Sequence, residues 1–451
     1  MMNRRDFFKF GLGGTGLAVG GSLATSFDKI PSSNSNGQNI HGQPWWVKKI
    51  EKPKLAIDDE VYSRFNSRNN VFGSFRRYYG IDNMKELMRR SREKTKKYYK
   101  ESRPGYRLED RALADAAWVI SRLGGLNRGT RSWISQNVTT PEKRGVSKYK
   151  GNPDEAARMI KAAARYFGAA TVGVTILDRR HINAKERGKN ILFEPVDEPS
   201  ENEEKLVIPD KCKYAISLSV QMSLENIQCS PTAIGSAGSA MGYSRCEFLV
   251  AGLAQFIRGL GYVAIPSVND LGSSVAIAVD AGLGELGRTN RVITPDFGPM
   301  VRVCKVLTDL PLAVDKPIDF GLLEFCKVCK RCAEECPSNC LSFDDEPGFE
   351  VKGEWNNPGH EAWFENAPKC LAYWRESTSG CSICLAVCPW SKKDKTIIHE
   401  IVKATSAKIP ALDGLFTSMD EAFGYGRQKS AGKWWHLDLP EYGIDTTRGK
   451  G

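Results

Sequence analysis

The chain has 451 residues, a length that corresponds to about three domains or fewer. Hydrophobic residues make up 41% of it and charged residues 26%, which excludes a disordered chain, a collagen-like chain and a small disulfide scaffold. The 64 basic residues exceed the 53 acidic ones by 11, an excess that favours an anionic partner only weakly. Five histidines argue against a histidine-rich metal site, whereas 13 cysteines make cysteine chemistry the first question.

The N-terminus has the pattern of an export signal. Arg4 and Arg5 precede apolar residues and Lys9, and an uncharged, glycine-rich stretch follows to about residue 27. That stretch is too short and too rich in glycine for a membrane span. The arginine pair resembles a twin-arginine signal, so residues 1–27 are predicted to be a signal peptide, with a chance basic N-terminus as the alternative. No other stretch is apolar over about 18 residues.

The predicted elements of the remaining chain alternate between helices and strands. Residues 28–60 are polar and are expected to be irregular, and the basic run 82–101 is predicted to be a helix with a solvated face rather than a patch for membranes or nucleic acid. The later elements, in chain order, are helices at 109–123 and 154–168, strands at 170–177 and 214–220, a helix at 246–260, a strand at 262–265, a helical run to about 281 and a strand at 300–307. This alternation predicts an α/β domain over residues 150–310.

Two runs of cysteines have the spacing of bacterial ferredoxins. The first run, C-x2-C-x2-C-x3-C-P, consists of Cys326, Cys329, Cys332 and Cys336, followed by Pro337. The second run lacks one cysteine of the pattern and consists of Cys381, Cys384 and Cys388, followed by Pro389. In such runs three thiolates bind one 4Fe–4S cluster and the fourth binds the other cluster. The repeated spacing disfavours zinc and disulfides.

The exchange of the fourth cysteine between runs predicts the ligands of two 4Fe–4S clusters. Cys370, eleven residues before Cys381, is the candidate for the missing ligand, with Cys340 as the alternative. One cluster is expected on Cys326, Cys329, Cys332 and Cys388, and the other on Cys336, Cys370, Cys381 and Cys384. The remaining cysteines are expected to be buried apolar side chains: Cys212, Cys229, Cys246 and Cys304.

Two clusters imply electron transfer, and the long chain before them is expected to use the electrons. Within that part, Gly282, Gly284 and Gly287 have the spacing of a dinucleotide fingerprint. The residues after them reach Pro295 without helical periodicity, so we do not interpret the run as a dinucleotide site. A glycine-rich backbone can approach a large flat ligand closely. The alternative for the tract 281–299 is a long loop without a ligand.

These features together resemble a known family. A twin-arginine signal, an α/β domain and two ferredoxin runs follow in that order, and the second run ends in Val387-Cys388-Pro389-Trp390. Between them lie Tyr243-Ser244-Arg245, Pro266-Ser267-Val268-Asn269-Asp270 and Gly282-Leu283-Gly284-Glu285-Leu286-Gly287-Arg288. The chain resembles the corrinoid-dependent reductive dehalogenases of organohalide-respiring bacteria, most clearly from about residue 235 to 395. It resembles more distantly the epoxyqueuosine reductases, cytoplasmic tRNA-modifying enzymes from which the export signal separates it.

The resemblance implies an α/β (α+β) fold, with a nitroreductase-like corrinoid-binding core followed by a bacterial ferredoxin-like domain that holds both clusters. The domains implied are a signal peptide at 1–27, an N-terminal region over the corrinoid and substrate pocket at 28–150, the core at 151–310, the ferredoxin-like domain at 311–395 and a C-terminal extension at 396–451. It also implies a cobalt without a protein histidine ligand. The chain lacks the Asp-x-His-x-x-Gly motif of histidine-ligated corrinoids, and Asp178-x-x-His181 has a different spacing.

The resemblance also implies roles for particular residues. By position, Tyr243, Asn269 and Arg302 surround the cobalt face, and Ser239 lies one helical turn before the tyrosine. Gly282, Gly284 and Gly287 are the further candidates for cofactor binding, and Trp118 and Trp374, with Trp45 or Trp46 behind them, are candidates for an aromatic substrate pocket. A tyrosine can donate a proton when a nearby arginine stabilises its phenolate, and an asparagine can donate to the phenolate or to the departing halide. Residues of these types otherwise serve as core or surface positions.

The expected function is therefore reductive dehalogenation outside the cytoplasm. Electrons pass through the two clusters to a Co(I) corrinoid, and Tyr243 supplies the proton that accompanies replacement of the halogen. The implied partners are an organohalide, expected to be chlorinated, an electron donor of the respiratory chain and a small integral-membrane anchor subunit on the outer face of the cytoplasmic membrane. No nucleic-acid partner is expected. The alternatives are an epoxyqueuosine-reductase-like enzyme and a two-cluster electron carrier without a corrinoid.

Overall fold

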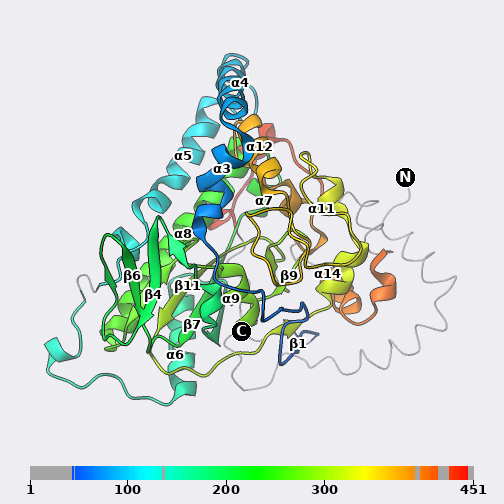
Figure 1. The fold of residues 1–451 in the computed structure, drawn as a ribbon. Coiled ribbons are helices and arrows are strands. Elements are labelled where there is room, and N and C mark those ends of the chain that lie inside the picture. Colours follow the sequence, from blue (N-terminus) through cyan, green and yellow to red (C-terminus); the bar gives the residue numbers. More distant parts are fainter. Residues whose placement is uncertain (1–42, 45, 135–137, 392–396, 415–425, 445–451) are drawn as a thin grey trace, which may run out of the picture. The chain divides into compact units, whose positions relative to one another are not determined.

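The computed structural model describes residues 43–44, 46–134, 138–391, 397–414 and 426–444 (Figure 1). The predicted signal peptide and Trp45 lie outside these ranges. No helix in the described ranges is both long and apolar enough to cross a membrane.

A four-stranded sheet with the order β2-β7-β11-β8 forms the centre of the fold (Figure 1). Its strands are β2 (Thr171–Ile176), β7 (Tyr214–Gln221), β11 (Val301–Thr308) and β8 (Ala264–Ser267). All neighbouring strands are antiparallel, with Arg302 opposite Val220. The strands predicted in these four places are confirmed, and so is the mixture of helices and strands, although the central sheet is antiparallel.

Helices cover both faces of this sheet, which explains why its strands are almost continuously buried. On one face α6 (Pro153–Tyr166) and α8 (Ala233–Gly259) pack on the even-numbered residues of β11, such as Cys304 and Val306. On the other face lies the short helix α9 (Ser274–Asp280), near Val303 and Leu307. Because side chains alternate along a strand, β11 presents Arg302 toward α8 and Val303 toward α9.

Helix α8 is about twice as long as the sequence pattern predicted, because it begins at Ala233 rather than near residue 246. Its first half is rich in glycine, alanine and serine, which give no apolar periodicity and, for glycine, disfavour helix. Thr232 caps the helix by accepting a hydrogen bond from Gly235 N–H. The small side chains let α5 (Leu108–Leu123) approach closely, with alanines of both helices in contact.

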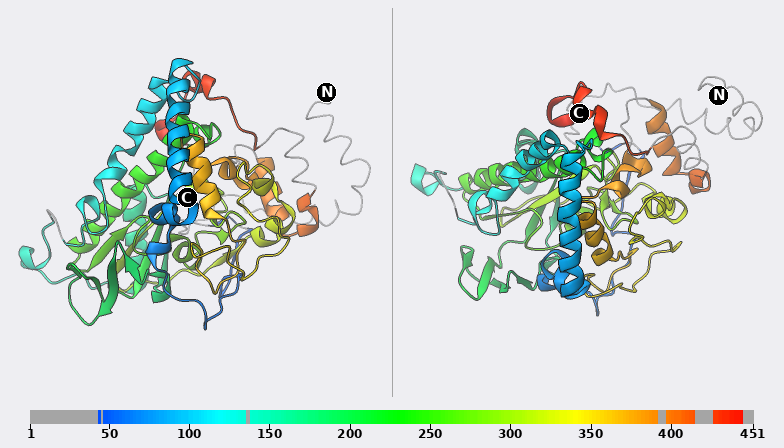
Figure 2. Two further views of the ribbon diagram at one scale, coloured as in Figure 1. Left: turned by 45° about the horizontal axis from the view of Figure 1, so that its top comes forward. Right: turned by 90° about the horizontal axis from the view of Figure 1, so that it is seen from above.

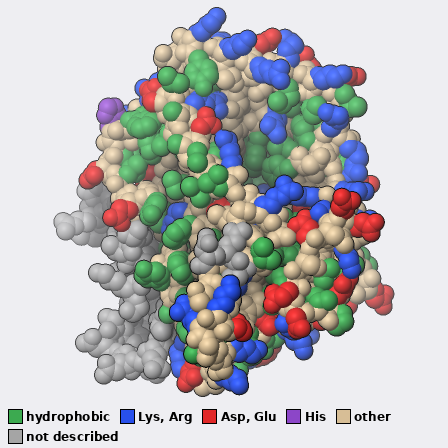
Figure 3. All heavy atoms as spheres, turned by 90° about the vertical axis from the view of Figure 1, so that its left-hand side faces the viewer, with side chains coloured by type: hydrophobic (Ala, Val, Ile, Leu, Met, Phe, Trp, Pro, Cys, Tyr) green, Lys and Arg blue, Asp and Glu red, His purple; other side chains and the backbone are tan. Residues whose placement is uncertain are grey.

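The predicted basic helix is confirmed as α4 (Ile81–Lys100), preceded by the unpredicted α3 (Val71–Tyr79). Both pack against α12 (Ala367–Glu376), and α4 stands beside α12 in Figure 2. Figure 3 shows Lys and Arg side chains gathered at the top of the view, where α4 lies in Figure 1. Arg89 pairs with Glu86 and Glu93 of the same helix, which supports the interpretation of a solvated face.

A second sheet, with the order β3-β4-β6-β5, lies beside the central one and was not predicted. Its strands are β3 (Lys185–Glu186), β4 (Lys189–Glu194), β5 (Ser200–Glu201) and β6 (Lys205–Pro209). Lysines and glutamates at most strand ends break the apolar alternation that sequence analysis relies on. Ile191, Leu206 and Ile208 nevertheless pack on the central sheet near Ala215.

The cysteine-rich part consists of loops and short helices, as its composition predicted. Besides α12, the helices of this part and of the loop after β7 are α7 (Leu224–Ile227), α10 (Leu322–Val328), α11 (Arg331–Glu334), α13 (Ile383–Ala386) and α14 (Ile397–Ser406). Two small antiparallel pairs join β1 (Lys48–Lys49) to β12 (Ile318–Asp319) and β9 (Glu285–Leu286) to β10 (Val292–Ile293). The first pair ties the N-terminal segment to the entry of the cysteine-rich part.

Candidate active site

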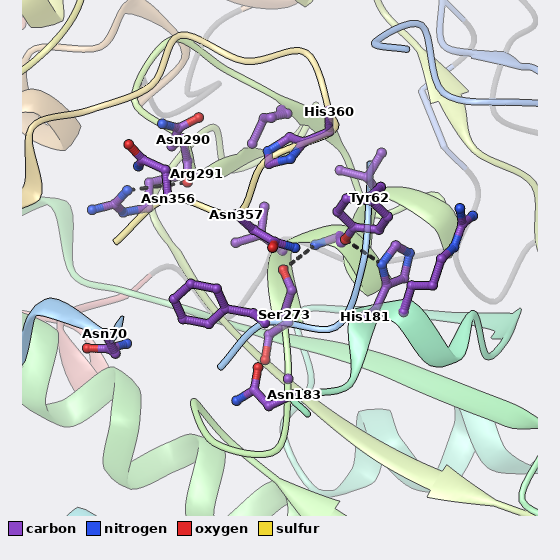
Figure 4. A pocket seen from close by; sticks show the side chains of 18 of the residues that line it. Tyr62, Asn70, His181, Asn183, Ser273, Asn290, Arg291, Asn356, Asn357 and His360 are labelled. Atoms are coloured by element: carbon purple, nitrogen blue, oxygen red, sulfur yellow. Dashed lines mark hydrogen bonds between the residues drawn. The ribbon is translucent and has the colours of Figure 1, made fainter. Parts of the chain in front are cut away.

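A cavity of about 1040 Å³ lies beside α9 and the β9 loop (Figure 4). Most of its wall comes from four segments of the chain: 53–77, 180–188, 269–291 and 355–365. Pockets for small molecules in proteins measure about 300–1,000 Å³. The cavity therefore has the size expected for a large ligand.

The first and last of these wall segments meet in a small contact that we call the wall clasp, formed by residues 56–58 and 359–361. It has few hydrogen bonds, and they join residues that are about 300 positions apart. The contacts are an antiparallel bridge between Ile57 and His360, a 2.8 Å hydrogen bond from Asp58 N–H to Gly359 O, a 2.9 Å bond from Glu361 N–H to Ala56 O and a 2.8 Å bond from Ala56 N–H to the Glu361 carboxylate. These hydrogen bonds close the wall next to the ring contact between Tyr62 and His360, which joins the same two segments.

The glycine-rich tract contributes to the cavity wall, but its three candidate glycines do not line it. Glu285, Leu286, Asn290 and Arg291 line the cavity. A Cβ added to Gly284 would lie 2.1 Å from the carbonyl oxygen of Ile293, so this glycine permits the close pairing of β9 with β10. Equivalent Cβ atoms on Gly282 and Gly287 would also meet protein atoms. No helix follows the tract, which confirms that it is not a dinucleotide fingerprint.

Tyr243 and Arg302 come together with Asn269, and of these three residues only Asn269 lines the cavity. The Asn269 amide donates to the Tyr243 hydroxyl at 2.8 Å, and the Arg302 guanidinium lies 4.6 Å from the centre of the Tyr243 ring. Arg302 also donates to Ser239 Oγ at 3.0 Å, and the Ser239 hydroxyl lies 3.4 Å from that of Ser382. A residue larger than glycine at 242 would press on the Arg302 side chain, because an added Cβ would lie 2.8 Å from its Cγ.

The four tryptophan candidates have different surroundings. Trp118, from α5, stacks on Tyr243 with ring centres 5.6 Å apart and an angle of 22° between the planes. Trp374, from α12, packs instead on Phe72 of α3, with ring centres 5.6 Å apart, and neither Trp118 nor Trp374 lines the cavity. Trp46 is buried in the apolar cluster around Phe320, and Trp45 lies outside the described residues. Only Trp118 of the described candidates contacts the tyrosine.

A fully buried lysine, Lys305, donates hydrogen bonds to the backbone of the loop that carries Asn269. Lys305 Nζ donates to the carbonyl oxygens of Val268, Asp270 and Gly272, at 3.4, 2.9 and 3.2 Å, and to Ser274 Oγ at 2.8 Å. Burial lowers the pKa of Lys305 to about 8. Asp270 is also paired with Arg131, whose guanidinium lies 3.1 Å from Glu247. These bonds fix the loop backbone on both sides of Asn269.

Replacing Lys305 with methionine is expected to lower the free energy of unfolding by about 3 kcal/mol or more, because each buried polar group left without its partner costs about 1–3 kcal/mol. Three buried carbonyl groups would lose their donor. Chemical unfolding of the anaerobic, cofactor-loaded protein measures the change. Lys205→Met is the matched control, because the partly exposed Lys205–Glu194 pair contributes about 1 kcal/mol or less. Equal destabilisation by both substitutions would contradict the role given to Lys305.

A chain of hydrogen bonds that sequence analysis missed crosses one side of the cavity (Figure 4). Tyr62 Oη lies 2.8 Å from His181 Nδ1, and His181 Nε2 lies 2.8 Å from the Asp280 carboxylate. Burial raises the pKa of Tyr62 far above its usual value, so its hydroxyl keeps the proton. The Asp280 carboxylate can only accept, so His181 Nε2 donates to it, and Nδ1 of the neutral imidazole then accepts from the Tyr62 hydroxyl. Both nitrogens of His181 are therefore engaged. The only sequence signal was the Asp178-x-x-His181 pattern, which does not reveal these partners.

His360 adds a nitrogen without a partner to the same side of the cavity. Its ring contacts Tyr62 edge to face, with ring centres 5.8 Å apart, and burial lowers its pKa, which favours the neutral imidazole. Its Nδ1 atom is buried and has no hydrogen-bond partner. The Nε atom of Arg302, beside Tyr243, is also buried without a hydrogen-bond partner. Buried polar atoms normally have partners, so His360, which lines the cavity, offers a nitrogen with which a bound group could pair.

The cysteines of the two runs fall into two groups that exchange one member, the arrangement expected from the spacing. Cys326, Cys329 and Cys388 lie in one apolar cluster with Phe325 and Trp390. Cys332 lies near all three of those cysteines, and it also packs with Cys336 and lies near Cys384, so it stands between the two groups. The second group lies around Cys336, which packs with Cys340, Cys370 and Cys384, and Cys381 is close to Cys384 and Cys336. Cys388 of the second run thus lies with the first run, and Cys336 of the first run lies with the second.

Arg291 connects the second cysteine group to the cavity. Its guanidinium lines the cavity, lies 3.2 Å from the Glu365 carboxylate and acts electrostatically on Cys384 and Cys370. The carboxylate of Glu365 raises the pKa of Arg291, so the arginine is always charged. The second cysteine group and the cavity thus share one cationic residue.

The other cysteines are buried, as expected from their positions outside the runs. Burial raises the pKa of Cys212 to about 12 and that of Cys229 to about 11, so both remain thiols. Cys246 and Cys304 are fully buried in the core between α8 and β11. All four therefore serve as small apolar side chains.

Comparisons with known proteins match this arrangement. Residues 42–194 and 187–312 match the family model described as reductive dehalogenase subunit, and residues 325–391 match that of a 4Fe-4S double cluster binding domain. The tetrachloroethene reductive dehalogenase of Sulfurospirillum multivorans is 38% identical over 360 residues, which cover 74% of this chain and 72% of that one. The enzyme of the same name from Desulfitobacterium hafniense strain Y51 is 34% identical over 327 residues, 66% of this chain and 59% of the relative.

A solved structure has the same fold. It is titled as a reductive dehalogenase structure that suggests a mechanism for B12-dependent dehalogenation, and it superposes with a TM-score of 0.64 at 24% identity. The superposition covers 87% of this chain and 50% of that one, so the chain spans about half the length of this solved relative. By the family model over more than half of its length and by its 38% identity to a curated member, the chain belongs to the reductive dehalogenase family.

Proposed function

We propose that this chain uses a corrinoid and two 4Fe–4S clusters to replace a carbon–halogen bond by a carbon–hydrogen bond in a chlorinated organic compound. One observation carries the proposal. The Tyr243 hydroxyl accepts a hydrogen bond from Asn269 and lies beside the Arg302 guanidinium, where Asn269 lines a cavity large enough for a corrinoid. The curated relatives named above act on tetrachloroethene, which makes chlorinated ethenes the first substrates to examine.

The residues of the cavity fit a corrinoid. The rim of a corrin ring carries amide side chains, and side-chain amides both donate and accept hydrogen bonds. The asparagines that line the cavity are Asn70, Asn183, Asn269, Asn290, Asn356 and Asn357. We propose that they hold the ring amides and that His360 Nδ1 accepts a further hydrogen bond. The engagement of both His181 nitrogens supports a cobalt without a ligand from that histidine. We further propose that the core around the central sheet is nitroreductase-like.

When bound, the corrinoid supplies a reduced cobalt centre that can break a carbon–halogen bond. The overall reaction takes two electrons and one proton and releases halide. Tyr243 donates the proton to the carbon that loses the halogen. The Arg302 guanidinium, 4.6 Å from the ring, and the Asn269 amide, 2.8 Å from the hydroxyl, stabilise the phenolate that remains. Trp118 covers the tyrosine ring and keeps water from it.

The cysteine groups support a ligand assignment for the clusters. We assign one cluster to Cys326, Cys329, Cys332 and Cys388, and the other to Cys336, Cys370, Cys381 and Cys384. Arg291 connects the second group with the cavity, which supports electron delivery from the clusters to the cavity. Both clusters lie in the matched double-cluster domain.

We also propose that the protein is exported by the twin-arginine route and is held on the outer face of the cytoplasmic membrane by a small integral-membrane anchor subunit. The Arg4-Arg5 pair supports export, because that route carries proteins already folded around their cofactors. A donor of the respiratory chain would then supply the electrons.

The test is metal analysis and turnover of the anaerobically purified, cofactor-loaded chain. About eight irons and one cobalt per chain are expected from the cysteine runs and the cavity. Tetrachloroethene should be dechlorinated with an artificial one-electron donor, with one chloride released for each two electrons consumed. Eight irons without cobalt after thorough corrinoid loading would overturn the proposal and leave an electron carrier. Cobalt binding with turnover of epoxyqueuosine rather than organohalides would favour the tRNA-modifying alternative.

A further inference from the structure

The second cysteine group contains one cysteine more than a 4Fe–4S cluster binds. A 4Fe–4S cluster takes four cysteine thiolates, whereas Cys340 joins the four cysteines assigned to this site. Cys340 is 6% exposed and packs with Cys336 and Leu341, with Cys370 and Cys384 at the edge of the same apolar cluster. Its place is therefore beside the cluster ligands rather than in an unrelated part of the core.

Short contacts fix this position. Cys340 Sγ lies 3.4 Å from Cys336 Sγ and also interacts with Cys370. The backbone between the two sulfurs makes a tight turn, with Asn339 N–H donating to Cys336 O at 3.1 Å and Asn339 in the left-handed region. The carbonyl oxygen of Cys340 accepts a 2.8 Å hydrogen bond from Asn366 N–H, at the start of the helix that carries Cys370. Cys340 is thus held between two assigned ligands.

The contact between sulfurs decides what Cys340 can do. Ligand sulfurs of a cubane lie on different corners and point away from one another. Two sulfurs in contact therefore do not both bind iron of the same cluster without moving apart. The ferredoxin spacing gives Cys336 the ligand role, so Cys340 is left as a thiol with one S–H donor, aimed at thiolates.

We infer that Cys340 tunes the second cluster by donating an S–H hydrogen bond to the thiolate of Cys336 or Cys370. This inference rests on the proposed ligand assignment. Hydrogen bonds to coordinating sulfurs stabilise the more negative, reduced form of a cluster and so raise its reduction potential. The Ser338 hydroxyl lies 3.4 Å from Cys336 Sγ and adds a second donor to the same sulfur. Cys340 is a positioning residue of the electron path and not a ligand.

The test compares Cys340→Ala and Cys340→Ser with the wild-type, cluster-loaded chain by iron analysis and an anaerobic redox titration followed by electron paramagnetic resonance. Both variants should keep all the iron of the wild type. In Cys340→Ala the midpoint potential of one cluster should become more negative, while that of the other stays unchanged. Cys340→Ser keeps a hydroxyl donor and should restore the potential wholly or in part. Cys212→Ala, a buried cysteine in another part of the core, should change neither potential.

Two results would overturn the inference. Loss of about half of the iron in Cys340→Ala but not in Cys370→Ala would make Cys340 the ligand, the alternative that the spacing left open. Full iron content with both potentials unchanged would leave Cys340 as simple packing. Neither result depends on cobalt or turnover, so failure of this inference is distinguishable from failure of the proposed dehalogenation. If Cys340→Ala does not fold, Cys340→Ser still distinguishes a hydrogen-bond donor from an iron ligand. A donor role predicts that this variant keeps all its iron while the potential of one cluster changes.

Discussion

Tyr243→Phe is expected to lower the rate of dechlorination by about 100- to 10,000-fold, the usual contribution of a positioned proton donor. The substitution removes only the hydroxyl, which Asn269 contacts at 2.8 Å. The ring keeps its stacking on Trp118 and its contact with Arg302, so the cavity should retain its shape. Single-turnover dechlorination by the prereduced enzyme measures the chemical step directly.

The control for this result is Tyr262→Phe. Its hydroxyl donates to Tyr149 O at 2.7 Å, so the same chemical group and one hydrogen bond are lost, but at the far end of α8. Cobalt and iron contents should match the wild type in both variants. If the Tyr243→Phe and Tyr262→Phe variants dechlorinated at the same rate, Tyr243 would not be the proton donor and another group would have to supply the proton. Loss of cobalt from Tyr243→Phe alone would instead make the tyrosine part of cofactor binding.

Exchange of ligands between the cysteine runs predicts the second large effect. Alanine at Cys388 should remove the same cluster as alanine at Cys326, although 62 residues separate them and Cys384 is only four residues away. Alanine at Cys336 should likewise match alanine at Cys381. Each variant should lose about four irons, half of those expected, and nearly all dechlorination because the electron path is broken. Iron analysis and the spectrum of the surviving cluster identify which cluster is lost.

Cys246→Ala is the control, because this cysteine is fully buried but lies in the core between α8 and β11, away from both runs. It should keep the full iron content. If the Cys388 variant resembled the Cys381 variant rather than the Cys326 variant, the ligands would follow the runs and the exchange would be wrong. The grouping of Cys388 with Cys326 and Cys329 in the structure argues for the exchange.

Local signals account for what the sequence could predict. The start of α6 follows from Asn152, whose side chain caps the helix, and from Pro153 at the first turn. The cysteine runs work in the same way, because cluster geometry requires close spacing along the chain. Elements with weak local signals were missed: the first half of α8 has small side chains, and the β3–β6 sheet has charged strand ends.

The candidate site shows the same limit. Tyr243, Asn269 and Arg302 were predicted through a family resemblance and not from their own pattern, and their meeting depends on α8, the loop after β8 and β11 together. The Tyr62–His181–Asp280 chain joins residues 119 and 99 positions apart, for which a single sequence gives no signal. Trp374 has the expected residue type and packs on α3 instead, because composition does not tell which side of a helix faces the cavity.

The wall clasp between residues 56–58 and 359–361 has a consequence for the order of assembly in the cell. One wall of the cavity is translated early and the other about 300 residues later, so the ribosome must pass residue 361 before the cavity is closed. The corrinoid is then expected to enter after translation has finished, when both walls exist. Three hydrogen bonds and the ring contact of His360 with Tyr62 hold the clasp, so we expect it to open locally at a lower free-energy cost than the core and to close again over the inserted group. Maturation would then end with a local closure of this wall.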